Sequence, residues 1–108
     1  MPTQAMRPYY VGGADMLVLR GSITLSPALI AQGTTAEQTF SCPGLRPGDC
    51  VMVTKPTAQA GLGIVGARCS TADNIGILFA NVPSAGGNIT PTASEVYQVT
   101  ALRFDTQL

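Results

Sequence analysis

A glycine motif stands out among the residues whose spacing could support chemistry. Residues 61–66 read Gly-Leu-Gly-Ile-Val-Gly, which matches the G-x-G-x-x-G pattern of dinucleotide-binding turns. In those turns the glycines let the backbone approach a pyrophosphate at the N-terminus of a helix. Residues 67–71, Ala-Arg-Cys-Ser-Thr, do not favour a helix, and no β-α-β pattern surrounds the motif. We therefore interpret 61–66 as part of a glycine-containing strand that another backbone or side chain approaches closely.

The side chains that usually perform acid–base catalysis are scarce. The chain has no histidine, so neither a Ser-His-Asp nor a Cys-His arrangement can form. A Ser–Lys pair would need Lys55, the sole lysine, which precedes Pro56 and is expected to be a solvated charge at a strand end. A pair of carboxylates for glycoside cleavage is the remaining possibility among the six acidic residues. Four of them, however, fall at arm, turn or terminal positions, where aspartate ordinarily caps or turns the backbone: Asp15, Asp49, Asp73 and Asp105. We expect no enzymatic activity and no cofactor.

The cysteines do not have the spacing of a metal site. Cys42, Cys50 and Cys69 are separated by eight and nineteen positions, whereas zinc sites pair their ligands at short spacings. In a reducing compartment they are expected to be small buried hydrophobic residues. A disulfide between Cys42 and Cys50, across the turn that joins them, is the alternative. We expect no bound metal.

Charge and hydropathy restrict the partners. The 108 residues include six Lys and Arg and six Asp and Glu, so no basic excess is available to neutralise nucleic acid. Only 11% of the residues are charged, which favours a surface that is partly an interface, although a neutral surface rich in Thr and Ser on a free domain is the alternative. No apolar run approaches the roughly 18 residues that span a bilayer. The first residues lack the basic start and apolar core of a signal peptide, so we expect synthesis in a cytosol-like compartment.

The hydrophobic pattern predicts an all-β chain. Residues 1–15 are expected to form an extended N-terminal arm, and 16–108 a single β-sandwich domain. Short strands separated by turn residues are typical of a compact sandwich or a minimal jelly roll, here of about 6–8 short strands. The predicted strands are 17–20, 22–31 (interrupted by Pro27), 36–42, 50–54, 62–69, 75–82 and 95–104.

Alternation along the strands predicts which side chains share a face. In 36–42 one face carries Gln38, Phe40 and Cys42. In 62–69 the inward residues are expected to be Val65, Ala67 and Cys69, with Arg68 outward. In 95–104 one face carries Tyr97, Val99 and Ala101, and the other carries Val96, Leu102 and Phe104.

The N-terminal segment contains the candidate partner interface. Tyr9 and Tyr10 are adjacent aromatic residues in a segment short of core-forming residues, so they are expected to contact a neighbouring subunit. The alternative is that both tyrosines pack on the chain's own sandwich. Arg7 and Arg20 complete the predicted interface as rim contacts, and Arg103 is a further candidate for the rim. A solvated position is the alternative for each of these three arginines.

Three segments together resemble a known family. They are 34–40 (Thr-Thr-Ala-Glu-Gln-Thr-Phe), 43–49 (Pro-Gly-Leu-Arg-Pro-Gly-Asp) and 61–68 (Gly-Leu-Gly-Ile-Val-Gly-Ala-Arg). With the final strand from Tyr97 to Arg103, the chain resembles the small all-β virion proteins of tailed bacteriophages. It is most similar to their capsid decoration, or cement, proteins. The resemblance covers roughly residues 22–104.

The resemblance implies a structural role. The sandwich would be made in the bacterial cytoplasm, dock on the outer surface of the capsid and bridge neighbouring shell subunits. Its partners would be the major capsid protein and copies of itself, as a dimer or trimer. The family has no catalytic motif to transfer. A receptor-binding or glycan-binding β module of a phage tail or fibre is the alternative function, for which the low aromatic content, 6% with no tryptophan, offers little.

Overall fold

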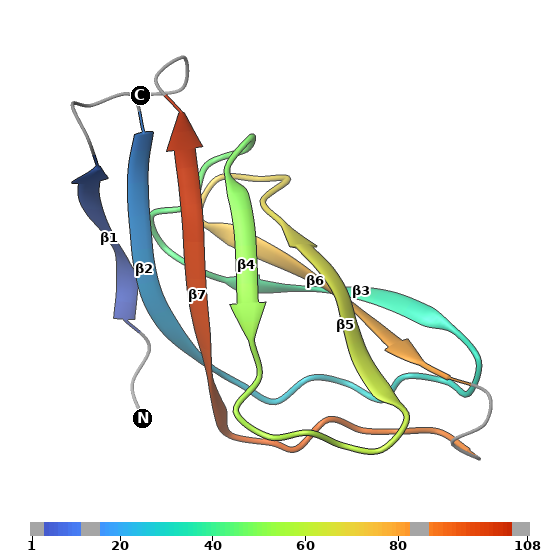
Figure 1. Cartoon of the computed structure of the whole chain (residues 1–108). Helices are drawn as coiled ribbons and strands as arrows, with labels where there is room; N and C mark the ends of the chain where they lie inside the picture. The colour runs from blue at the N-terminus through green and yellow to red at the C-terminus, as the bar shows by residue number, and fades with distance from the viewer. Residues whose placement is uncertain (1–3, 12–15, 83–86, 105–108) are drawn as a thin grey trace.

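The computed structural model describes residues 4–11, 16–82 and 87–104; within 4–11 it describes the backbone and the side chain of Met6. The described residues form strands and no helix (Figure 1). The strands are β1 (Gln4–Val11), β2 (Met16–Leu25), β3 (Thr35–Ser41), β4 (Cys50–Thr54), β5 (Leu62–Arg68), β6 (Asn74–Asn81) and β7 (Glu95–Phe104). The all-β prediction is confirmed, with the strands at 50–54 and 95–104 at their predicted bounds.

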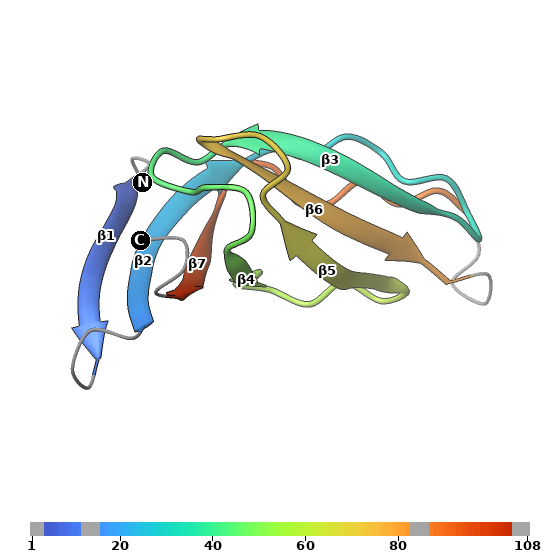
Figure 2. The same ribbon diagram turned by 90° about the horizontal axis from the view of Figure 1, so that it is seen from above.

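Two antiparallel sheets pack as a sandwich. The larger sheet has the strand order β1-β2-β7-β4, and the smaller sheet has the order β3-β6-β5. Figures 1 and 2 show the strands of the smaller sheet running obliquely to those of the larger one. Each sheet therefore has one face on the shared core and one outer face, the usual situation for antiparallel sheets.

Strand alternation delivers apolar side chains to the core from both sheets. Phe40 packs against the core from β3, and Tyr97, Val99 and Ala101 of β7, which the sequence predicts to share a face, are all buried. The fully buried centre is built mainly from β2, β6 and β7. Its members with at most 1% exposure include Ile23, Ile30, Leu45, Ile75, Ile77, Phe79, Tyr97 and Val99.

A β-bulge overturns the prediction for Val65. This side chain is 63% exposed, although period-two alternation with Ala67 and Cys69 predicts that it faces inward. The pairing of β5 with β6 runs from Ile64 opposite Phe79 directly to Gly66 opposite Leu78, so Val65 is the extra residue of a bulge. The bulge lets Ile64 and Ala67 both pack against the core, three positions apart. Arg68 is exposed, as predicted.

The predicted strands 17–20 and 22–31 are replaced by one strand and a loop. Gly21 does not interrupt β2, because it pairs with Val99 of β7. The strand ends at Leu25, before Pro27, which has no backbone N–H to donate to a ladder. The loop is held instead by side chains: the Gln38 amide binds both the N–H and the carbonyl of Ala28, at 2.8 and 2.9 Å.

The N-terminal segment is extended, as predicted, but residues 4–11 lie along the sandwich as the edge strand of the larger sheet. Met6 is buried, and its amide donates to the Pro43 carbonyl at 2.9 Å. Gly44 has a positive φ of 100°, and a Cβ there would lie 2.9 Å from the Met6 Cβ. A glycine at 44 therefore permits close contact between β1 and the turn before β4. Residues 1–3 and 12–15 of the predicted arm lie outside the described residues.

Candidate functional site

The predicted interface residues meet in one ladder at the edge of the larger sheet. Arg7 is the cross-strand partner of Arg20, Tyr9 of Val18, and Tyr10 of Leu17. Arg20 is exposed, whereas the side chains of Arg7, Tyr9 and Tyr10 lie outside the described part of the structure. The ladder thus brings the four residues together at the level of the backbone.

The outer face of the larger sheet continues from this ladder and is unusually apolar. Met52 and Phe104 are 56% and 47% exposed, and Cys50 is exposed as well. We call six side chains on this face the outer apolar patch: Met16, Val18, Cys50, Met52, Leu102 and Phe104. The sequence predicts that Leu102 and Phe104 share a face, but it does not predict the patch as a whole. The available signal was that strands 16–25 and 50–54 also carry apolar residues on both of their alternating faces.

The most buried ion pair joins Asp49 to Arg103. Arg103 Nε donates to Asp49 Oδ1 at 2.9 Å, and its Nη2 donates to Asp49 Oδ2 and to the Gly44 carbonyl, both at 2.8 Å. Both side chains are at most 5% exposed. The predictions of a rim position or a solvated position for Arg103 are therefore wrong, because inward alternation on β7 places it beside a buried carboxylate.

Hydrogen bonding controls the ionisation of Asp49. Burial by itself raises the pKa of this carboxyl group, but hydrogen bonds from Arg103 and from the Arg46 amide, with the charges of both guanidinium groups, lower it overall. The Arg46 amide donates to Asp49 Oδ2 at 3.0 Å, so this aspartate also closes the turn that the sequence predicts.

Lys55 forms the second ion pair, with Glu95 at 2.8 Å. Its side chain is only 8% exposed, so the prediction of a solvated charge is wrong. Lys55 Nζ also donates to the carbonyl and the hydroxyl of Thr57, and the Thr57 hydroxyl donates to Glu95. These hydrogen bonds from Lys55 and Thr57 lower the pKa of Glu95. The cluster ties the end of β4 to the start of β7.

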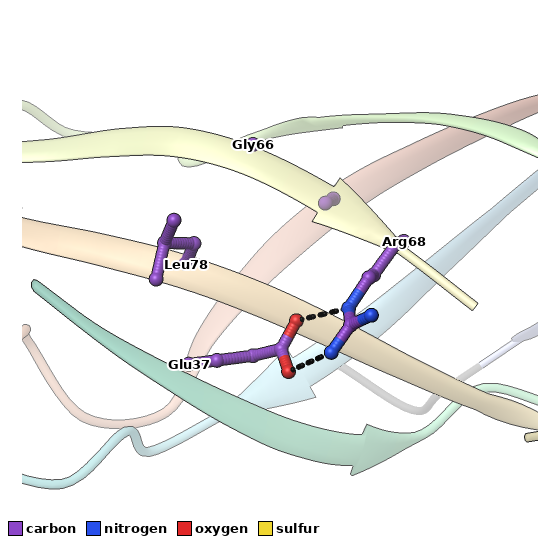
Figure 3. A pocket seen from close by; sticks show the side chains of 5 residues that line it. Glu37, Gly66, Arg68 and Leu78 are labelled. Carbon is purple, nitrogen blue, oxygen red and sulfur yellow. Dashed lines mark hydrogen bonds and ion pairs between the residues drawn. The ribbon is translucent and has the colours of Figure 1, made fainter. Parts of the chain in front are cut away.

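A shallow pocket of about 420 Å³ lies on the outer face of the smaller sheet (Figure 3). Its lining consists of Glu37, Gly66, Ala67, Arg68 and Leu78. Glu37 and Arg68 form a bidentate ion pair above β6, with N–O distances of 2.7 and 2.9 Å. A Cβ at Gly76 would lie 2.8 Å from Glu37 Oε2, so a glycine beneath the pair leaves room for it.

The glycine motif forms no phosphate-binding turn. Residues 62–68 are strand β5, as the sequence interpretation expects, and Gly61 alone of the motif lies in a turn, with φ of 81°. Without a helix N-terminus after the motif, its amides cannot converge on a pyrophosphate. Gly66 instead lines the pocket. A Cβ at Gly63 or Gly66 would meet nothing within 4 Å, so the prediction that another group approaches these glycines closely is wrong.

All three cysteines are free thiols. Cys42 and Cys69 are buried, as predicted, and burial raises the pKa of Cys42 to about 11. Cys50 is exposed on the outer face, which corrects the prediction that all three are buried. Within the described residues, no group of three or more His, Cys, Asp or Glu side chains is placed to hold a metal ion.

Comparisons with protein-family models, curated proteins and solved structures found no match to this chain. Among the described segments there is no helix of the length and apolarity needed to cross a membrane. Function must therefore be argued from the surface of the molecule and from the chemistry of its side chains.

Proposed function

We propose that this chain is a structural virion protein that decorates and stabilises a phage capsid by bridging shell subunits. The outer apolar patch is the observation that carries the proposal. The outer face of an antiparallel sheet in a sandwich is normally polar, because water covers it. An exposed cluster such as Met52, Leu102 and Phe104 is instead typical of a surface that another protein covers.

The use of the charged residues supports the same proposal. Three cations are paired with three carboxylates, in Asp49–Arg103, Lys55–Glu95 and Glu37–Arg68. Asp73 accepts a hydrogen bond from the Gly44 amide at 2.9 Å. Each carboxylate in the described part of the chain thus has a structural role, and the sequence contains no histidine to act as a proton carrier. We infer a protein that acts by binding and is not an enzyme.

Mass action gives the mechanism. A protein that binds the assembled shell but not separated subunits stabilises the shell by RT ln(1 + [L]/Kd). In this mechanism the sandwich is a rigid spacer, and its exposed faces contact the major capsid protein on the outer surface of the particle. The protein needs no cofactor for this role.

Purified particles provide the direct test. Mass spectrometry of virions, with labelling by an antibody visible in electron micrographs, is expected to find the protein on the head in many copies. Adding the purified protein to particles that lack it is expected to raise the temperature at which the shell opens. Absence from the virion, or a location on the tail, would contradict the proposal.

A second candidate function rests on the pocket beside Glu37 and Arg68. Its polar ion pair borders an apolar floor that includes Leu78, a combination that suits a sugar ring with its hydroxyl groups. A glycan-binding module of a tail or fibre should give reproducible binding on a glycan array, and Arg68→Ala should remove it. Binding that Arg68→Ala leaves unchanged would exclude this pocket as the site.

A further inference from the structure

We propose that two copies of this chain pack face to face through the outer apolar patch of the larger sheet. The inference names an occupant for the patch on which the proposed function rests. The dimer is tested on the isolated protein. A failure of the dimer would therefore leave capsid decoration untouched, and a failure of capsid decoration would leave the dimer untouched.

Ladder register makes the patch continuous. Leu102 pairs with Val18 on one side and with Cys50 on the other, so these three residues form a row across the sheet. The next row toward one end of the sheet pairs Met16 with Phe104. The row toward the other end contains Met52, Thr100 and Arg20. Adjacent positions on one face of neighbouring strands are in side-chain contact range, so the six apolar residues form one surface.

The polar residues of this face lie toward its other end. Gln98 is exposed and pairs with Thr54, which is also exposed. Protein–protein interfaces combine an apolar core with a polar, solvent-accessible rim. The outer apolar patch has such a polar border on the side of Gln98 and Thr54.

The area of the larger sheet is sufficient for a weak dimer. Its strands contain 8, 10, 10 and 5 residues, in the order β1-β2-β7-β4. With strands about 4.8 Å apart and about 3.3 Å per residue, the face projects roughly 500 Å². Two copies thus bury roughly 1,000 Å², the lower limit for a specific interface. The projection understates the accessible area, because the side chains stand out from the sheet.

The smaller sheet is a poorer candidate for the same contact. Its strands contain 7, 8 and 7 residues, and its outer face carries the Glu37–Arg68 ion pair. The same spacing gives roughly 350 Å² for one copy, which falls short of a stable interface. The second copy is therefore assigned to the larger sheet.

Charge favours a copy of the same chain as the occupant. Among the described side chains on the outer face of the larger sheet, Arg20 alone is charged, and it lies beside the patch in the row of Met52. The described side chains of this face offer no carboxylate to a basic partner and a single cation to an acidic one. A two-fold contact brings together the same apolar surface from both copies, so it does not require opposite charge on the partner. It also leaves the smaller sheet of each copy free, so a dimer presents two identical outer faces with which to bridge shell subunits.

Sedimentation velocity of the purified protein is the test, from about 1 µM to about 500 µM, because mass action makes a weak dimer depend on concentration. Wild-type protein is expected to dimerise within this range. Met52→Glu is expected to raise the dissociation constant at least about a hundredfold, since each dimer then buries two carboxylates. Val65→Glu is the matched control, because Val65 is 63% exposed on the other sheet and should leave dimerisation unchanged.

Cys50 supplies a second readout of the same contact. Cys50 is the exposed thiol among the three cysteines and lies in the patch. Its alkylation by iodoacetamide is expected to slow as the wild-type concentration rises, and to be independent of concentration in Met52→Glu. Cys42 and Cys69 are buried, so their slow reaction serves as an internal check of folding. Met52→Ser replaces Met52→Glu if the charged variant does not fold.

Two results would overturn the inference. One is a wild-type protein that stays monomeric throughout the concentration range. The other is a dimer that survives both substitutions at Met52, because the interface then lies elsewhere. Neither result bears on whether the protein binds particles, which the capsid experiment measures separately.

Discussion

Asp49 and Arg103 join parts of the chain that are 54 positions apart in the sequence. Through them, β7 is attached to the turn between β3 and β4, and that turn holds the buried Met6 of β1 through the Pro43 carbonyl. Removing one member of a buried ion pair costs more than the pair itself contributes, because the remaining charge has no compensation. These two residues are therefore expected to be the most sensitive charged positions in the described structure.

The first prediction is that Asp49→Asn lowers the free energy of unfolding by about 3 kcal/mol, the lower end of the range for breaking a buried pair. The neutral amide leaves the Arg103 guanidinium buried without its counter-ion. Urea unfolding followed by circular dichroism measures the loss. Glu37→Gln is the control, because its partner Arg68 is 66% exposed and water replaces the lost contact. Equal losses in the two variants would contradict the account.

At the scale of elements, the bulge in β5 decides which side chains of that strand reach the core. Before the bulge, Leu62 and Ile64 pack inward; after it, Ala67 and Cys69 do so. The sequence interpretation obtained the second half of the strand correctly and misplaced Val65, since simple alternation has no signal for an extra residue. The bulge itself depends on pairing with β6, which is a tertiary contact.

The second prediction concerns deletion of Val65. Removing the bulge residue leaves Ile64 opposite Phe79 and Gly66 opposite Leu78, so regular alternation keeps Ala67 inward and Arg68 outward. We expect this variant to fold cooperatively, with a free energy of unfolding within about 1 kcal/mol of wild type. Inserting an alanine between Gly66 and Ala67 is the contrasting change, because it turns Ala67 outward and Arg68 into the core, where an unpaired guanidinium costs several kcal/mol. Thermal melts compare the two variants, and an unfolded deletion variant or an insertion variant as stable as wild type would contradict this account.

For the whole molecule, a formal charge of zero conceals an uneven distribution. Most described charges are paired within the chain. The exposed side chains of Met52 and Phe104 lie on the outer face of the larger sheet, whereas Leu29, Val65 and Val82 are exposed elsewhere. The interpretation of the 11% charged fraction as a partly interfacial surface stays a prediction, and we assign that interface to the outer apolar patch. Which face it is could not be inferred, because strand order determines which residues share it.

The third prediction is a broad plateau of stability against pH. Hydrogen bonding with neighbouring cations lowers the pKa of Glu37 and Glu95, and the pKa of Asp49 is lowered despite its burial. Their contribution to stability is present above the ordinary carboxyl pKa values of about 4 and is lost as pH falls through the lower folded values. No histidine is present to titrate between them and the alkaline groups.

On the alkaline side the sign reverses. Burial raises the pKa of Cys42 from 9.0 to about 11 and that of Tyr97 from 10.0 to about 12. Their contribution is complete below the ordinary values and is lost as pH rises toward the folded values. Urea midpoints measured from about pH 2 to about pH 11 should be flat between about pH 5 and pH 8 and fall on both sides. A sharp change in stability near pH 6.5 would contradict this account.

The sequence by itself determined the fold class, the positions of most strands and the residues that share a face in β3 and β7. These features follow from local alternation and turn chemistry, which act over a few neighbouring residues. The tertiary structure alone decided that Arg103 is buried, that residues 4–11 are an edge strand, that Val65 faces solvent, and that the outer apolar patch is one surface. Each of these features depends on pairing between segments that are distant in the chain. The order in which strands pair is not encoded in the alternation of apolar and polar residues within any one strand.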